Sequence, residues 1–445
     1  MRSRLLKASL LSGLFVFGAC GGVNEPKFKS SKLGMGSTLE ELQNRLKTAK
    51  EDKDPISANE TQLEINYQTE LERAGMDAEE QGRVHRKYKI LKEVFQDELR
   101  DYRENPSSFM KGFGMETDTE YYDGPVFSSV YHPLVLQEVE RVYKDYGRLY
   151  VNVTLDDQGR PAFKSVAVRK ENEPWAGDWY PFHRKSLYTG PEAPLKKFED
   201  LLKKKGKQTH LIKRETDRFD RSRYDHWEGM CFQHSLAAAV SPEPKKELII
   251  EGIRFSIADQ KALLTFTHLG YPHVMYGVDY RGDSKTDGTF QDLKPEAVHQ
   301  LILSVVGKEG RSLIADDDPG PTVWFKNIKS YRYKIEQDPQ KDYVLNLKAY
   351  VHLVKERSKE TDDPTNDDDI IVPVYTARFY VDKKDKKDGQ YAVLGGQWVG
   401  SSFRDHIDMI GVPSLKGELK SHNESFNKYM KLYKSLFMNP SSQVR

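Results

Sequence analysis

The residue best suited to covalent chemistry in this chain is Cys231, in the stretch HWEGMCFQHSLAAAV (226–240). The Ala-rich run after it ends at Ser241-Pro242, which predicts a helix with Cys231 in its first turn. Unpaired backbone N–H groups at a helix start carry partial positive charge, which favours a thiolate and lowers the pKa of a thiol. Gly229 permits a tight turn close to a ligand. The stretch is typical of a nucleophilic cysteine, and a buried, inert cysteine is the alternative.

The other cysteine, Cys20, belongs to a predicted N-terminal targeting signal. Three basic residues precede a short apolar run at 8–19, which is too short to span a bilayer. The ending FGAC resembles a bacterial lipobox, so we expect residues 1–19 to be removed and Cys20 to be lipidated. Acyl chains on Cys20 would anchor the protein to a membrane of the bacterial cell envelope, with the outer membrane as the expected location. A plain secretory signal, or a disulfide between Cys20 and Cys231, is the alternative.

With Cys20 lipidated, Cys231 has no disulfide partner. An unpaired thiol in an oxidising compartment is a liability, because it oxidises or cross-links. This argument favours a chemical role for Cys231.

A nucleophilic cysteine needs an imidazole within reach, and the imidazole needs a carboxylate or amide to orient it. The chain has 12 His, of which His226 and His234 flank the cysteine in sequence. His299 lies 17 residues before Asp316. The order Cys, His, Asp with a short His–Asp interval suits a base and an orienting residue on adjacent elements. The choice among the histidines stays open on these grounds.

The composition indicates a folded protein with a substantial core. The chain has 445 residues, of which 37% are hydrophobic and 31% charged, and its 24 Tyr, 20 Phe and 5 Trp argue against global disorder. The formal net charge is +1, so no field attractive to nucleic acid follows from it. The basic run LKKKGK (202–207) is interpreted as a solvated helix end. We therefore expect two or three domains and no nucleic-acid partner.

The elements that must position these residues change in character along the chain. Residues 20–36 form a polar tether, and 37–110 are helical in pattern, starting at a Ser37-Thr38-Leu39-Glu40 capping box. Residues 111–412 form the predicted catalytic domain, and 413–445 a final helix and tail. Alternating segments predict strands at 323–335, 342–354, 372–381 and 390–399, and a pair of strands within 147–168 around an Asp-Asp-Gln-Gly turn. Helices around a largely antiparallel sheet make an α+β fold.

Several blocks in the same order resemble the transglutaminase elicitor family of oomycetes, which has relatives in bacteria. WEGMC (227–231) is similar to that family's Trp-x-Gly-x-Cys nucleophile block. Further similar blocks are GIRFSIADQKALL (252–264), QDLKPEAVH (291–299), SLIAD (312–316), VWFKNIKSYRYKI (323–335) and GGQWVGSSFRDHID (395–408). The resemblance covers roughly residues 175–412. It implies a papain-like active site with Cys231 as nucleophile, His299 as base and Asp316 as orienting residue.

The resemblance further implies a protein-glutamine γ-glutamyltransferase that joins a glutamine donor to a lysine acceptor through a cysteine thioester. No cofactor is required. Acidic runs at 316–318 and 362–369 offer oxygen ligands for calcium, although no dedicated metal site is expected. Trp227 and Trp398 are candidate walls of a substrate groove. The chain departs from the family pattern at Gln233 and His234, where Gly-Trp is usual, and at Glu296, where Gly is usual.

Two other functions remain open on the sequence. Water in place of lysine would make the same thiol a papain-like cysteine peptidase or amidase, because partition depends on water exclusion and on an acceptor groove. A catalytically inactive cell-envelope lipoprotein that keeps the fold for binding is the third reading. The changes at Gln233 and His234 favour it, and the retained cysteine opposes it.

Overall fold

The structure is a computed structural model of the chain. It describes residues 37–52, 54–105, 133–184, 186–207, 209–213, 225–277, 293–318, 322–403, 406–414 and 431–438. The predicted signal, Cys20 and the tether lie outside these residues. Within them, no helix combines the length and the apolar character needed to cross a membrane.

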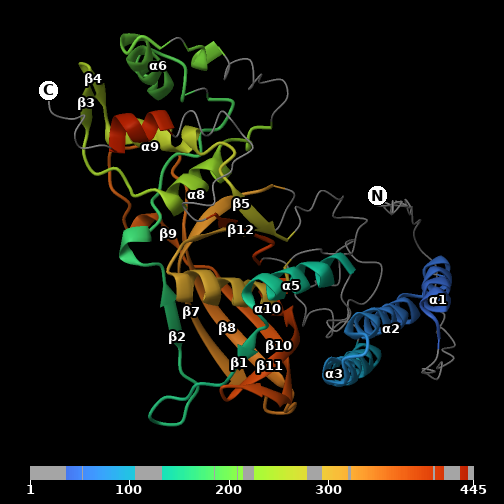
Figure 1. Ribbon diagram of the computed structural model, residues 1–445. Coiled ribbons are helices and arrows are strands. Elements are labelled where there is room, and N and C mark those ends of the chain that lie inside the picture. The colour runs from blue at the N-terminus through green and yellow to red at the C-terminus, as the bar shows by residue number, and fades with distance from the viewer. Residues whose placement is uncertain are drawn as a thin grey trace.

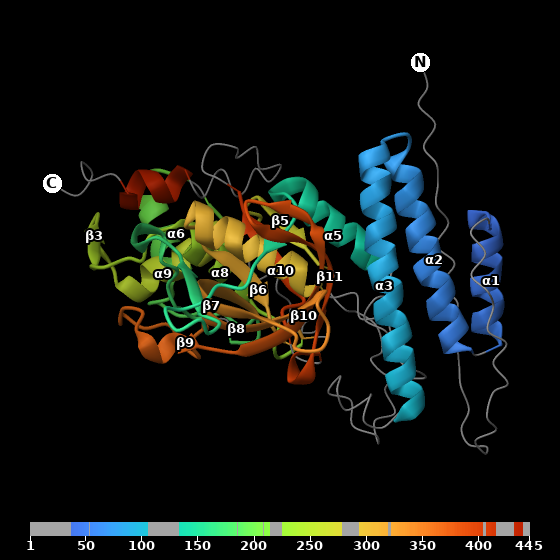
Figure 2. The same ribbon diagram turned by 90° about the horizontal axis from the view of Figure 1, so that it is seen from below.

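Three long helices occupy the N-terminal part: α1 (Leu39–Glu51), α2 (Pro55–Ala74) and α3 (Ala78–Glu104). Thr38, one residue later than predicted, caps α1 in a capping box with Glu41. Figure 2 shows the three helices side by side, with α3 next to the body of the protein. The apolar stripe of α3, which includes Phe95, packs against Val344 and Tyr380 of the sheet. Burial of this apolar stripe holds α3 against the sheet.

The centre of the fold is a sheet of ten strands in which every pair is antiparallel. The order is β1-β11-β10-β8-β7-β6-β12-β5, with β2 on β7 and β9 on β8 (Figure 1). The strands are β1 (Tyr150–Val151), β2 (Lys164–Ala167), β5 (His273–Tyr276), β6 (Leu313–Asp316), β7 (Phe325–Gln337), β8 (Val344–Val354), β9 (Ile370–Ile371), β10 (Val374–Lys387), β11 (Gln390–Trp398) and β12 (Met409–Pro413).

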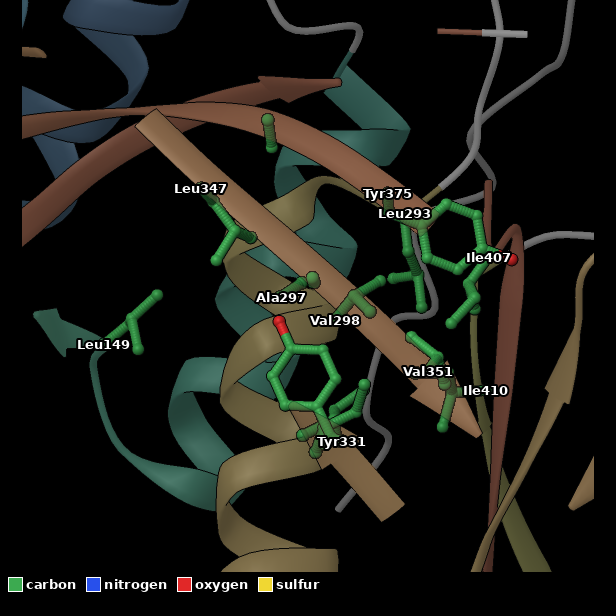
Figure 3. Packing of buried hydrophobic residues seen from close by; sticks show 14 of the residues in the cluster. Leu149, Leu293, Ala297, Val298, Tyr331, Leu347, Val351, Tyr375, Ile407 and Ile410 are labelled. Carbon is green, nitrogen blue, oxygen red and sulfur yellow. The ribbon is translucent and has the colours of Figure 1, made fainter. Parts of the chain in front are cut away.

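Helices cover one face of this sheet, and their apolar side chains form with it the largest apolar cluster of the described residues. They are α5 (Pro133–Tyr146), α10 (Pro295–Leu301) and the π-helical turn η3 (Ile302–Glu309) that continues α10. Figure 3 shows Ala297 and Val298 of α10 among the sheet residues Tyr331, Val351 and Ile410. We call this side the α10 face.

The opposite face carries α8 (Cys231–Val240), which contacts β7, β6 and β12. Behind α8 lie α9 (Ile257–Thr267), α6 (Pro194–Lys204) and the small hairpin of β3 (Leu248–Ile250) and β4 (Ile253–Phe255), which share a second apolar cluster. We call this side the α8 face. Short turns η1 (Lys170–Asn172), η4 (Asp367–Asp369), η5 (Gly400–Phe403) and η6 (Lys434–Met438) complete the described elements.

The α+β class, the four long strands and the helix after Cys231 agree with the sequence predictions. The predicted turn within 147–168 is present as a short hairpin closed by an antiparallel bridge between Leu155 and Pro161, while the flanking strands pair elsewhere, β1 with β11 and β2 with β7. β10 continues to Lys387, beyond the predicted strand end at 381, and only Asp388 and Gly389 have the positive φ of a tight turn.

Candidate active site

Cys231 is the first residue of α8, as the Ala-rich run predicts. The preceding amide, Met230 N–H, donates to the carbonyl of Trp179 at 2.6 Å, which ties the helix start to the Trp179 segment. The Cys231 side chain is partly exposed, and its Sγ lies 3.9 Å from the carbonyl oxygen of Val323. Backbone amides of Phe325 and Phe232 donate to the sulfur, which favours a thiolate. The thiol therefore lies at a helix start, largely covered by the surrounding protein.

Gly229 is required for packing. A Cβ at this position would stand 2.4 Å from the ring of Trp179, a distance that side chains do not tolerate. The glycine lets the chain pass under the indole just before the cysteine.

Asp316 ends β6 on the same face as Cys231. Its Oδ1 accepts a hydrogen bond from Trp324 N at 2.9 Å, and the carboxyl is 3% exposed. Residue alternation places Ile314 and Asp316 on the α8 face, where Ile314 packs in one cluster with Cys231 and Phe325. Burial is the largest influence on the carboxyl and raises its pKa to about 7. Asp316 is thus a carboxyl that titrates near neutrality beside the thiol.

His299 lies on the other side of the sheet. Its Nδ1 pairs with the hydroxyl of Tyr331 at 2.8 Å, its ring packs against Tyr333 with centroids 4.8 Å apart, and it is 1% exposed. Tyr331 and Tyr333 belong to the α10 face, whereas Phe325 and Asn327 of the same strand face α8. The prediction that His299 serves Cys231 is therefore wrong. Burial lowers the pKa of His299 to about 3.

His299 is buried away from Cys231 because of the way α10 begins. Pro295 occupies its first position, and Glu296 continues the helix where a glycine would favour a turn. A helix that starts here buries its whole short length against the sheet, and His299 goes into the core with it.

No imidazole among the described residues makes a hydrogen bond to Cys231. His234 is 2% exposed under Trp175, and burial lowers its pKa to about 3. His273 lies on the α8 face but pairs with Pro413, at the opposite end of β12 from the Met409–Asp316 pair.

A second carboxyl, Glu356, completes the site. The antiparallel register pairs Asn327 of β7 with Val354, the last residue of β8, and Glu356 follows two residues later, close enough for its charge to act on Cys231. Phe325 pairs with Asp316, and the charges of Glu356 and Asp316 both act on the thiol. Burial first and then the charge of Glu356 raise the pKa of Cys231 to about 12. The helix start alone does not yield a thiolate at neutral pH.

Aromatic residues border the thiol, but not the two that the sequence suggested. Trp398 is 6% exposed, and its Nε1 donates to the Leu293 carbonyl at 2.9 Å, on the α10 face. Its assignment to a substrate groove is wrong. Trp227 is partly exposed in the turn before α8. The ring of Trp179 covers Gly229, two residues before Cys231, and meets the ring of Trp324 with centroids 5.1 Å apart. Trp324 lies in the block VWFKNIKSYRYKI, which resembles the family, whereas nothing in the sequence marked Glu356.

The acidic runs suggested for calcium make other contacts. Asp317 pairs with Lys326, Asp369 with Arg357, and Asp362 accepts the amide of Ala258 at the start of α9. Among the residues that the structure describes, no three His, Cys, Asp or Glu side chains converge as metal ligands would.

A cysteine at the head of a helix, packed on an antiparallel sheet beside an acidic strand end, defines a thiol-centred α+β fold. The transglutaminase elicitor family model matches residues 203–438, just over half of the chain. The chain belongs to the transglutaminase elicitor family.

One solved structure to which the chain is similar is the crystal structure of the GP42 transglutaminase from Phytophthora sojae. The identity is 17%, the TM-score is 0.49, and the match covers 67% of this chain and 97% of that chain. A comparison with curated proteins gave no match.

Proposed function

We propose that this protein is a transglutaminase in which Cys231 is the nucleophile and Asp316, rather than an imidazole, exchanges the proton. The observation that carries the proposal is the placement of Asp316. Its carboxyl shares the α8 face with the partly exposed thiol and has a pKa near 7. A group with that pKa is half ionised at neutral pH, so it can both accept and return a proton.

The reaction has two halves. In the first, the Cys231 sulfur attacks the carboxamide carbon of a protein glutamine, the thiol proton passes to Asp316, and Asp316 returns it to the departing ammonia. Backbone N–H groups at the start of α8 stabilise the oxyanion. In the second half, a lysine amine attacks the thioester, the C–S bond breaks, and an isopeptide bond forms. The step uses no cofactor. The partners are a glutamine donor and a lysine acceptor.

The cost of ionising the thiol is compatible with turnover. Transfer from a group of pKa about 12 to one of about 7 is uphill by at most five units, or about 7 kcal/mol, because the charge of Asp316 that helps to raise the thiol pKa is lost in the transfer. A turnover near one per second corresponds to a barrier of about 17 kcal/mol, so about 10 kcal/mol remains for the attack itself.

The full-length chain in detergent, incubated with a glutamine-bearing protein and a fluorescent primary amine, tests the proposal. We expect incorporation that is lost in Cys231→Ala, reduced at least 100-fold in Asp316→Asn, and retained in His299→Gln. Ammonia release without incorporation would show a hydrolase instead. Incorporation that survives Asp316→Asn but not His299→Gln would contradict the assigned proton acceptor.

A second candidate is a non-catalytic protein of the cell envelope. The observation that favours it is the thiol itself, which has a pKa of about 12 and no imidazole partner among the described residues. In that case, neither ammonia release nor amine incorporation occurs at any pH from 6 to 9. We further propose that lipid on Cys20 holds the protein to the envelope membrane.

A further inference from the structure

One carboxyl oxygen of Glu356 is buried and has no hydrogen-bond partner. Its Oε1 is shielded from solvent and accepts no hydrogen bond. Buried carboxyl oxygens in native proteins are almost always paired, and one that is not calls for an explanation. The nearby cation, Lys326, is engaged by Asp317, and the other charges that face Glu356 are the carboxyls of Asp317 and Asp178. Lys326 and the Arg184 that pairs with Asp178 offset part of this negative charge, but neither donates a hydrogen bond to Glu356 Oε1.

The backbone holds this carboxyl at the thiol. The amide of Arg357 donates to the Gly177 carbonyl at 2.8 Å, and Asp178 and Arg357 form a parallel bridge. One residue further along, the Trp179 carbonyl accepts the amide that precedes Cys231. Glu356, the residue before Arg357, is thus tied to the Trp179 segment, and its charge acts on Cys231.

The surroundings suit a primary ammonium ion. The partly exposed Trp179 and Trp324 stand edge to face, and the guanidinium of Arg184 already lies 5.5 Å from the Trp179 ring centre, which shows that cations approach these indoles. A lysine side chain offers an apolar stem for the aromatic walls and a cationic tip for the carboxylate.

We propose that Glu356, with Trp179 and Trp324, forms the acceptor subsite that receives the ammonium group of the incoming lysine and removes one proton from it. The proposal rests on the transglutaminase function proposed above. Glu356 takes a proton from R–NH₃⁺, and the neutral amine attacks the thioester carbon. The C–N bond forms, the C–S bond breaks, and the second amine proton returns to the sulfur through Asp316. The proton on Glu356 then leaves to water and balances the ammonia released in the first half.

Binding tests the subsite without requiring activity. The probe is N-acetyl-lysine methylamide, titrated into the Cys231→Ala chain and followed by tryptophan fluorescence. N-acetyl-norleucine methylamide, which lacks the charge, is the control ligand, and Glu171→Gln, at an exposed position, is the control substitution. Adding Glu356→Gln to Cys231→Ala should weaken lysine binding at least tenfold and leave norleucine binding unchanged. Equal lysine binding with and without Glu356→Gln overturns the subsite, as does failure of the Cys231→Ala chain to bind lysine.

Kinetics separate this proposal from the function on which it rests. With Cys231 present, Glu356→Gln should raise the KM for cadaverine at least tenfold, while ammonia release in the absence of amine persists. Hydroxylamine, which is uncharged at neutral pH, should be spared this loss, so the ratio of kcat/KM for cadaverine to that for hydroxylamine should fall at least tenfold in the variant. A loss with hydroxylamine equal to that with cadaverine would refute a role specific to cations. Absence of all ammonia release in the wild type refutes the transglutaminase function, and the binding titration still decides the subsite.

Discussion

Replacing Glu356 by Gln should make Cys231 more reactive, although Glu356 lies at the active site. Glu356 is the largest charge that acts on the thiol, and a nearby negative charge disfavours a thiolate. With a thiol pKa of about 12, only about one molecule in ten thousand carries a thiolate at pH 8. Alkylation should then be roughly a thousandfold slower than for free cysteine.

The predicted difference in alkylation rate between Glu356→Gln and the wild type depends on pH. Burial raises the pKa of Glu356 to about 7, so its carboxyl is neutral well below pH 7 and charged above it. Removing the charge should lower the thiol pKa by about one unit, the low end for a nearby charge. We therefore expect Glu356→Gln to react about tenfold faster than wild type with iodoacetamide at pH 8.5. At pH 5.5 the two rates should converge.

The assay is the alkylation rate of Cys231, followed by mass spectrometry of the peptide that contains it, from pH 5.5 to 9. Asp316→Asn should shift the rate in the same direction by less, because Asp316 is the weaker of the two charges on the thiol. Glu171→Gln should match the wild type. A rate ratio that does not change with pH, or a slower rate in Glu356→Gln, would refute the electrostatic account of this site.

Three further outcomes follow from the structure. Between pH 7 and pH 5 the low folded pKa of His299 should cost about 2 kcal/mol of unfolding free energy, because the unfolded histidine gains a proton that the folded one refuses. Carboxyls with raised pKa act in the opposite direction, so the measurement compares urea unfolding of the wild type with that of His299→Gln. Between pH 7 and pH 5 the unfolding free energy of His299→Gln should fall by about 2 kcal/mol less than that of the wild type. An equal fall in both proteins counts against a buried neutral ring. Gly229→Ala should destabilise the fold by about 1–3 kcal/mol and disturb the Trp179 segment, seen as a changed tryptophan emission, because its Cβ has no room; a wild-type Tm and emission would contradict this. Metabolic labelling with a fatty-acid analogue should mark the wild type and not Cys20→Ala; equal labelling of both would remove the lipid anchor.

The sequence alone determined the parts of the site that depend on local chemistry. Cys231 starts a helix because a run of good helix formers follows it and Pro242 stops it, and both signals lie within a dozen residues. The long strands were predictable in the same way, since alternation is written along each of them. Asp316 at the end of SLIAD also follows from local pattern.

Tertiary structure decided which residues meet. The spacing of His299 and Asp316 suggests neighbours, yet one projects from α10 and the other from the opposite face of the sheet, because a shift of one position along a strand reverses the side that a residue faces. Glu356 follows β8, which pairs with β7, and α8 packs on β7. These contacts bring Glu356 near Cys231, more than a hundred positions earlier in the chain. The raised pKa of Cys231 depends in part on the proximity of Glu356. The helix start favours a thiolate, but burial beside two carboxyls outweighs it, and neither burial nor the carboxyls can be read from the residues around the cysteine.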